Sequence, residues 1–170
     1  MDNKDKKGTA MKSFIRTSLL AATYYFAILL PSACTDGTFY HQYKKVSSDK
    51  WQKTDTVTFE LPQIWQNEEL NAEIGVRTTD NYNYTNLFML GILERNGEGV
   101  STDTLLINIY NHDGTKNGNG FLFTTTTRQL PSIHVDSGMH YTYKVVHFMK
   151  PRQIEGVASI GLKLKHDNIR

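Results

Sequence analysis

The stretch from Met11 to Cys34, MKSFIRTSLLAATYYFAILLPSAC, constrains this chain most, because it has the pattern of a bacterial export signal. Lys12 and Arg16 supply a positively charged start, and Ser18–Leu30 is an uncharged apolar run of 13 residues. Such a run suits the core of a signal peptide and is shorter than the roughly 20 residues that a membrane-spanning helix needs. We therefore expect everything after Cys34 to fold outside the cytoplasm.

The end of this stretch predicts lipid attachment at Cys34, the only cysteine in the chain. Ser32 and Ala33 are small residues, which suit the extended peptide that a signal peptidase cleaves. Pro31 departs from the usual lipoprotein pattern, in which a leucine stands at that place. We expect Cys34 to carry acyl chains such as palmitate, with an ordinary secretory signal and an incidental cysteine as the alternative.

The predicted domain organisation has three parts. Residues 1–33 form a cleaved signal peptide, helical before cleavage, for which Met11 is an alternative start. Residues 34–37 are the lipidated cysteine and a short spacer, and residues 38–170 form a single domain. The 136 residues after Cys34 are enough for one hydrophobic core, and they contain no second cysteine for a disulfide.

The net charge of the mature part argues against nucleic acid as a partner. The full chain carries +2, but the leader holds five Lys and Arg residues against two Asp, which leaves about −1 after Cys34. Binding to a phosphate backbone needs clustered Lys and Arg. The membrane, reached through the lipid on Cys34, is the first expected partner.

Short segments of alternating polarity predict an all-β mature domain. Apolar and polar residues alternate in Val57–Leu61, Leu70–Val76, Tyr141–Val145 and Ile160–Leu164. Leu87–Leu93 is apolar at both parities, which predicts a strand covered on both faces. Seven or eight such strands, with no helix-period stripe, predict an antiparallel β-sandwich of the jelly-roll type, with a small barrel as the alternative.

Local signals predict several further elements. Thr38–Val46 is expected to be an edge strand, and Asn96-Gly97 predicts a hairpin that leads into the strand Asp103–Tyr110. Gln63–Leu70 could form a single helical turn. Phe121 and Phe123 are expected to lead a strand that continues through the threonines at 124–127.

The mature chain lacks the motifs that carry common enzyme chemistry. It has no Gly-x-Ser-x-Gly elbow and no phosphate-binding loop. His134 and Asp136 could supply two metal ligands, but the sequence indicates no third, so a solvated pair is preferred. Glu68 and Glu69 are interpreted as solvated charge. We predict no catalytic residues, no cofactor and no metal site.

Aromatic residues are the more promising candidates for binding. Trp65, Tyr82 and Tyr84 lie in segments expected to be loops or strand ends, where such rings could stack on sugars or grip a partner protein. Packing in the core is the favoured interpretation, because large aromatics dominate small β cores. A binding surface formed by these three residues is the alternative.

Three stretches of the mature chain resemble a known family. They are Trp51 with DTVTF at 55–59; Arg77 with YNYTNL at 82–87; and Tyr143 with HFM at 147–149 and IEGVASIGL at 154–162. The family that they resemble is the gliding motility lipoprotein GldH family of the Bacteroidota. Its pattern near the end resembles Met-Arg, whereas Pro151 shifts the arginine here to Arg152, so no role is carried over to that arginine.

The resemblance implies a non-catalytic lipoprotein of the cell envelope, anchored through Cys34 in the outer or the inner membrane. Its body would face the periplasm, with the cell surface as the alternative. It would support the gliding machinery and linked secretion, or envelope assembly, through contacts with other envelope proteins. The competing hypothesis is a glycan-binding surface lipoprotein that uses Trp65, Tyr82 and Tyr84.

Two short motifs resemble the site at which Bacteroidota glycosylate exported proteins. Asp55-Thr56-Val57 and Asp103-Thr104-Leu105 both have an aspartate, a threonine and an aliphatic residue in sequence. Thr56 and Thr104 are therefore candidates for O-glycosylation.

Overall fold

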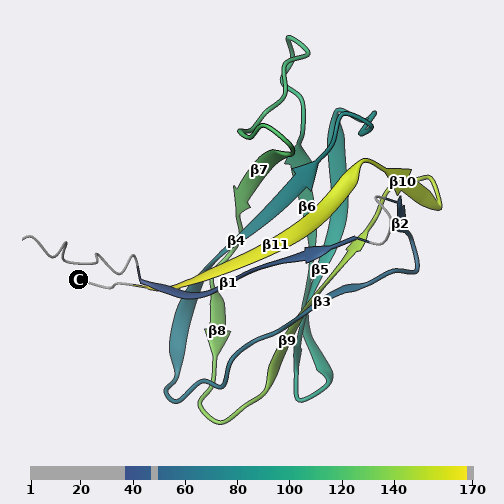
Figure 1. The fold of residues 1–170 in the computed structure, drawn as a ribbon. Helices are drawn as coiled ribbons and strands as arrows, with labels where there is room; N and C mark the ends of the chain where they lie inside the picture. Colours follow the sequence, from purple (N-terminus) through teal and green to yellow (C-terminus); the bar gives the residue numbers. More distant parts are fainter. Residues whose placement is uncertain (1–36, 47–49, 168–170) are drawn as a thin grey trace, which may run out of the picture. The chain divides into compact units, whose positions relative to one another are not determined.

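Two antiparallel β-sheets form the fold (Figure 1). The alternating apolar residues lie between them, as the sequence predicts. The computed structural model describes residues 37–46 and 50–167. Sheet 1 has the order β1-β11-β4-β7, with β8 also paired to β4, and sheet 2 has the order β3-β9-β5-β6. Strands β2 and β10 form a separate two-stranded ribbon. The strands are β1 (Thr38–Lys45), β2 (Lys50–Gln52), β3 (Val57–Glu60), β4 (Glu68–Thr78), β5 (Asn86–Arg95), β6 (Glu98–Asn108), β7 (Thr124–Gln129), β8 (Ile133–Val135), β9 (Tyr141–His147), β10 (Gln153–Glu155) and β11 (Val157–His166).

The order of the strands is that of a jelly roll. When the eight strands other than β2, β8 and β10 are numbered along the chain, the sheets read 1-8-3-6 and 2-7-4-5. In this topology, successive strands pass from one sheet to the other and pair with strands distant in the sequence, except at the hairpin that joins β5 to β6. The prediction of an all-β, jelly-roll-like sandwich is confirmed.

The core lies between the sheets and is built from one parity of each strand. In β4, Leu70, Ala72, Ile74 and Val76 are fully buried, and their polar neighbours face outward. The same side chains pack against residues of sheet 2, such as Met89, in one continuous cluster. Burial of this apolar surface, at about 25 cal/mol per Å², is the main force that holds the two sheets together.

The prediction of a helical turn at Gln63–Leu70 is wrong. The chain is irregular from Leu61 to Asn67, and β4 begins at Glu68. The backbone carbonyl of Ile64 accepts a hydrogen bond from the N–H of Gly138, so a distant loop satisfies a group that a helix would have paired internally. Within residues 37–46 and 50–167, no helix could span a membrane.

The hairpin predicted at Asn96-Gly97 joins β5 to β6. Both residues have positive φ, 52° for Asn96 and 85° for Gly97, as the tight turn of a two-residue hairpin requires. Strand β6 starts at Glu98, five residues before the predicted start at Asp103, because the ladder begins directly at the turn. The first residues of β6 are exposed on both faces, so polar and apolar side chains do not alternate there, and the sequence does not indicate a strand.

Trp51 anchors the short β2-β10 ribbon to the core. Its side chain is fully buried, and Nε1 donates a hydrogen bond of 2.9 Å to the backbone oxygen of Asp55. The indole meets the ring of His147 edge to face, with 5.5 Å between the centroids. Burial lowers the pKa of His147, so the imidazole is neutral at neutral pH.

We predict that Trp51→Ala destabilises the fold by about 3–5 kcal/mol, since it leaves a large cavity in the core. Urea unfolding followed by circular dichroism measures this change. The matched control is Trp65→Ala, because Trp65 is 79% exposed and its removal should change stability by less than about 0.5 kcal/mol. Equal effects of the two substitutions would contradict the assignment of Trp51 as a core residue.

Candidate functional site

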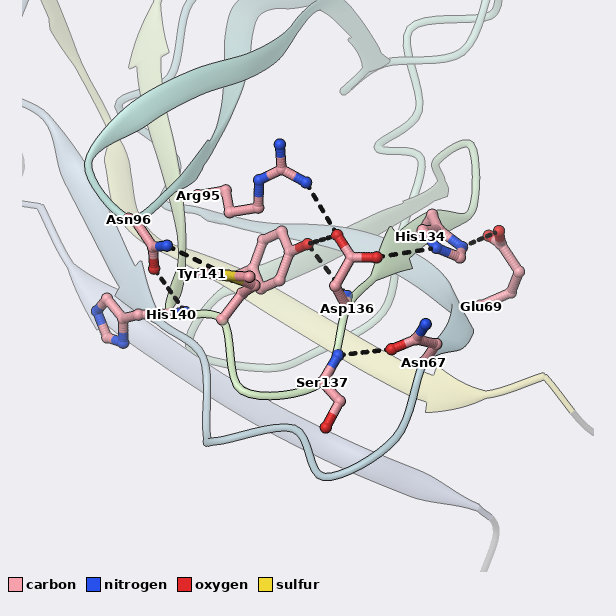
Figure 2. Close-up of polar contacts among 10 residues, drawn as sticks. Asn67, Glu69, Arg95, Asn96, His134, Asp136, Ser137, His140 and Tyr141 are labelled. Atoms are coloured by element: carbon pink, nitrogen blue, oxygen red, sulfur yellow. Dashed lines mark hydrogen bonds and ion pairs between the residues drawn. The ribbon is translucent and has the colours of Figure 1, made fainter.

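A group of bonded polar side chains joins the two sheets at one end of the sandwich (Figure 2). Arg95 ends β5 and Tyr141 begins β9, so both come from sheet 2. Glu69 lies on β4 and His134 on β8, so both come from sheet 1. Asp136 directly follows β8 and stands between the two pairs. We call these five residues the polar clasp.

Asp136 is the centre of the polar clasp. Its Oδ2 accepts hydrogen bonds from Nη1 of Arg95 at 2.9 Å and from Oη of Tyr141 at 3.1 Å. Its Oδ1 lies 3.4 Å from Nε2 of His134. The bond from Tyr141, followed by that from Arg95, lowers the pKa of the Asp136 carboxyl below its ordinary value. The carboxylate therefore remains ionised and in contact with both sheets at neutral pH.

The two adjacent glutamates at the start of β4 bind different histidines. Oε1 of Glu69 lies 2.8 Å from Nδ1 of His134, and this bond raises the pKa of the histidine. Oε2 of Glu68 lies 2.6 Å from Nδ1 of His166. The nitrogens of His134 point to separate carboxylates, Glu69 and Asp136, so they do not converge on one ion. In the part of the chain that the structure describes, no group of three His, Cys, Asp or Glu residues could hold a metal.

Hydrogen bonds of the neighbouring loops hold the polar clasp in place. Oδ1 of Asn96 accepts a bond of 3.0 Å from the backbone N–H of His140, and Oδ1 of Asn67 accepts one of 2.8 Å from that of Ser137. Figure 2 shows both bonds beside the clasp. The bonds within the clasp join side chains of the two sheets at this end of the sandwich.

The predicted aromatic surface does not form as one surface. Trp65 is 79% exposed in the loop before β4, whereas Tyr82 is 1% exposed in the loop after β4. Tyr84 is partly buried and packs edge to face on Tyr82, with 5.7 Å between the ring centroids. The length of β4 separates Trp65 from the two tyrosines. This geometry corrects the expectation of a shared stacking platform and favours the core interpretation for Tyr82.

The outer face of sheet 2 carries an apolar surface that the sequence indicated only indirectly. Phe88, Leu90 and Ile92 of β5 point away from the core, and strand pairing places apolar residues of β6 and β9 beside them. Phe88 is 39% exposed, and Phe148, whose N–H bonds the carbonyl of Phe88, is 56% exposed. The members of this outer apolar face are Phe88, Leu90, Ile92, Leu106, Val146 and Phe148.

The apolar residues at both parities of Leu87–Leu93 predict a strand covered on both faces. Among the described residues, only the inner face is covered, by the core. The outer apolar face is therefore in contact with solvent. Exposed contiguous apolar surface on a rigid element is typical of a site for a protein partner.

A second exposed apolar feature precedes β7. Phe121 is fully exposed, Leu122 is 78% exposed and Phe123 is 41% exposed. The strand that we expect to start with these residues begins only at Thr124, so this prediction is corrected. The base of the loop is fixed: the side chain of Asn117 donates to the backbone oxygen of Asn108 at 2.9 Å. We call residues 121–123 the loop tip.

The remaining predicted positions fall in three environments. Cys34 and residues 1–33 lie outside the described residues. Thr56 is exposed in the loop before β3, beside Asp55, whose Oδ2 accepts a hydrogen bond from the backbone N–H of Gln52 at 3.3 Å. Thr104 is exposed on β6. Both threonines are accessible from solvent.

The structure thus defines an antiparallel jelly-roll domain with an outer apolar face and, among its described residues, no group of three His, Cys, Asp or Glu that could hold a metal. A family profile described as GldH lipoprotein matches residues 38–164. The chain belongs to this family.

Curated relatives agree with this assignment. A gliding motility lipoprotein GldH from Flavobacterium johnsoniae is 35% identical over 95 residues, which are 56% of this chain and 59% of the relative. A gliding motility lipoprotein GldH homolog from Christiangramia forsetii is 24% identical over 164 residues, which are 91% of this chain and all of the relative.

The similarity to solved structures is more remote. A mannanase of Podospora anserina is 12% identical over 78% of this chain and 29% of its own, at a TM-score of 0.41. The dimeric latent PorU of Porphyromonas gingivalis is 15% identical over 77% of this chain and 13% of its own, at a TM-score of 0.33. At these TM-scores the likeness does not bear on function.

We predict that the polar clasp stabilises the fold most between about pH 4 and pH 6.5, the ordinary pKa values of aspartate and histidine. The pKa of Asp136 is lowered, so its contribution is full above the unfolded value and is lost as pH falls through the folded one. The pKa of His134 is raised, so its contribution is full below the unfolded value and is lost as pH rises through the folded one.

Urea unfolding of the wild type, Asp136→Asn and His134→Gln from pH 3 to pH 8 tests this window. The loss of stability caused by Asp136→Asn should shrink below pH 4, and that caused by His134→Gln should shrink above pH 7. Losses that stay constant across the whole range would contradict the electrostatic role of the clasp.

Proposed function

We propose that this chain is a gliding motility lipoprotein that is anchored through Cys34 and acts through contacts with other envelope proteins. Its role is to support the gliding machinery and linked secretion, or envelope assembly. Membership of the GldH lipoprotein family supports the anchor and the setting. The outer apolar face of sheet 2 is the observation that supports a role in protein contacts.

The outer apolar face suits a protein partner for two reasons. Its side chains come from three neighbouring strands, β6, β5 and β9, and from Phe148, which directly follows β9. Backbone hydrogen bonds hold these strands in place, so the surface needs little ordering on binding. Its exposed aromatic side chains, Phe88 and Phe148, have the residue type that carries much of the free energy of protein interfaces.

We further propose that the body faces the periplasm, from either the outer or the inner membrane. The spacer Thr35-Asp36-Gly37 lacks the acidic run that resembles a surface-export signal, which supports this orientation. Thr56 and Thr104 are proposed O-glycosylation sites, and their exposure is consistent with access by a transferase. Membership of the GldH lipoprotein family supports a role without catalysis.

Deletion of the gene in its host bacterium should reduce surface spreading or the release of secreted proteins. The wild-type gene should restore both activities. A Phe88→Thr/Phe148→Ser variant should fail to restore them, because it removes the aromatic part of the outer apolar face. Spreading zones on agar and protein profiles of the culture medium measure the result.

The matched control for this experiment is Trp65→Ser, which removes an exposed aromatic residue elsewhere on the surface. It should restore both activities, and all variants should accumulate to equal levels. A deletion strain that spreads, secretes and assembles its envelope like the wild type would overturn the proposed function.

We predict that growth with an alkyne analogue of palmitate labels the wild-type protein, because the lipid is attached to Cys34. Cys34→Ala should remove the label completely, since Cys34 is the only cysteine in the chain. In-gel fluorescence after coupling to an azide dye measures the label, and fractionation shows whether the unlabelled variant leaves the membrane. Equal labelling of both proteins would show that the lipid is attached elsewhere.

A further inference from the structure

The outer face of sheet 1 carries a tyrosine ring that lies across two strands. Tyr43 of β1 pairs with Gly161 of β11, and Gly161 pairs with Gly75 of β4. A Cβ atom at Gly75 would collide with the hydroxyl of Tyr43, and one at Gly161 would collide with the carbon atoms of the ring. The ring therefore lies directly on the backbone of both glycines. A side chain at Gly75 or at Gly161 would prevent the ring from lying in this position.

Arg77 of β4 covers the other face of this ring. Its Cζ lies 3.8 Å from the ring centroid of Tyr43, so the guanidinium is stacked above the ring. With Gly161 and Gly75 beneath the ring, the guanidinium lies on the solvent side. Cation–π stacking fixes its plane while its N–H groups remain available at the edges.

The side chain of Arg77 has no hydrogen-bond or ion-pair partner among the described residues, and its stacking on Tyr43 is its one specific contact there. This differs from Arg95, which is bonded to Asp136 at 2.9 Å. An arginine that is oriented but unpaired can bind an anion, since two parallel N–H groups of its guanidinium match the two oxygens of a carboxylate.

The surroundings of Arg77 favour a negatively charged partner. The register places Lys45, Ser159, Arg77 and Thr125 in one outward row across the sheet. A second outward row, four residues away along the strands and beyond the row of Tyr43, contains Lys163 and Glu73. These two rows hold three cations and one carboxylate. That carboxylate, Glu73, accepts a hydrogen bond of 3.0 Å from Gln129.

We propose that the outer face of sheet 1 binds a partner protein through a carboxylate that is received by Arg77 on its Tyr43 support. This deepens the proposed function and rests on it, because it names a second contact surface and the chemistry of the group it takes. The carboxylate accepts two parallel N–H···O bonds from the guanidinium. Lys45, in the same row, adds long-range attraction to an acidic surface.

Two alternatives fit the surface less well. A phosphate site commonly adds unpaired backbone N–H groups, but β4 is paired on both sides along the row of Arg77. A sugar would need a free aromatic face, but both faces of Tyr43 are covered. Tyrosine and arginine are also the residue types most enriched where single side chains dominate a protein interface.

Photo-crosslinking in the host cell tests the proposal with the full-length, anchored protein. The crosslinker benzoylphenylalanine replaces Thr127, which is exposed and pairs with Gly75 on the same face. A second strain carries it at Thr102, which is exposed and pairs with Ile92 on the outer face of sheet 2. Mass spectrometry then identifies what is attached to each position.

We expect a protein adduct at Thr127 whose crosslinked peptide contains or adjoins an Asp, a Glu or a C-terminus. Its yield should fall roughly tenfold in Arg77→Gln and also in Tyr43→Ala, which removes the support of the guanidinium. Arg77→Lys should also lower the yield, because an ammonium cannot form the paired bonds. Tyr43→Phe keeps the ring and should retain the yield.

Lys150→Gln is the matched control, because it removes one exposed cation from another part of the chain. The yield at Thr127 should not change in this variant. An adduct at Thr127 with lipid or lipopolysaccharide in place of protein would overturn the proposal. A yield that does not depend on Arg77, or the absence of any adduct at Thr127, would overturn it as well.

The same experiment separates this proposal from the proposed function. A protein adduct at Thr102 without one at Thr127 would reject the carboxylate site and leave the role in protein contacts standing. No adduct at either position, together with a deletion strain that behaves like the wild type, would reject both.

Discussion

The sandwich depends on the hydrogen-bonded ladder of β4. This strand pairs with β11 on one side and with β7 and β8 on the other, so its backbone groups are satisfied along most of its length. Its inward side chains are fully buried, and its outward ones form the centre of sheet 1. A strand fixed in this way has one register, because a shift by one residue would move Leu70 and Ile74 to solvent.

Much of the fold could be predicted from the sequence because its signals are local. Alternation in Leu70–Val76 and the Asn96-Gly97 turn depend on neighbouring residues, and both predictions match the structure. The polar clasp depends on contacts between distant positions, such as Glu69 with His134, so only His134 and Asp136 could be noted as a pair. Exposed strand ends such as the start of β6 carry no burial pattern and could not be predicted at all.

The two outer faces differ in chemistry although one fold produces both. On sheet 2, apolar residues at both parities of β5 leave Phe88 partly in solvent, beside the exposed Phe148 that follows β9. On sheet 1, the outward rows hold charged and polar side chains around a stacked Arg77. The sequence signalled the first face through its composition. It could not signal the second, because Tyr43, Gly75 and Gly161 meet only through the strand order of the jelly roll.

The position of β1 has a mechanical consequence. Thr38, at the start of β1, pairs with Lys165 beside the beginning of β4, whereas the loop tip precedes Thr124, which pairs with Thr78 at the end of β4. A pull between Thr38 and the loop tip therefore runs along the strands. Antiparallel hydrogen bonds lie across this direction, so the bonds between β1 and β11 would be loaded together in shear and would not peel apart one by one. The pairing of β1 with β11 therefore resists a force applied along the strands.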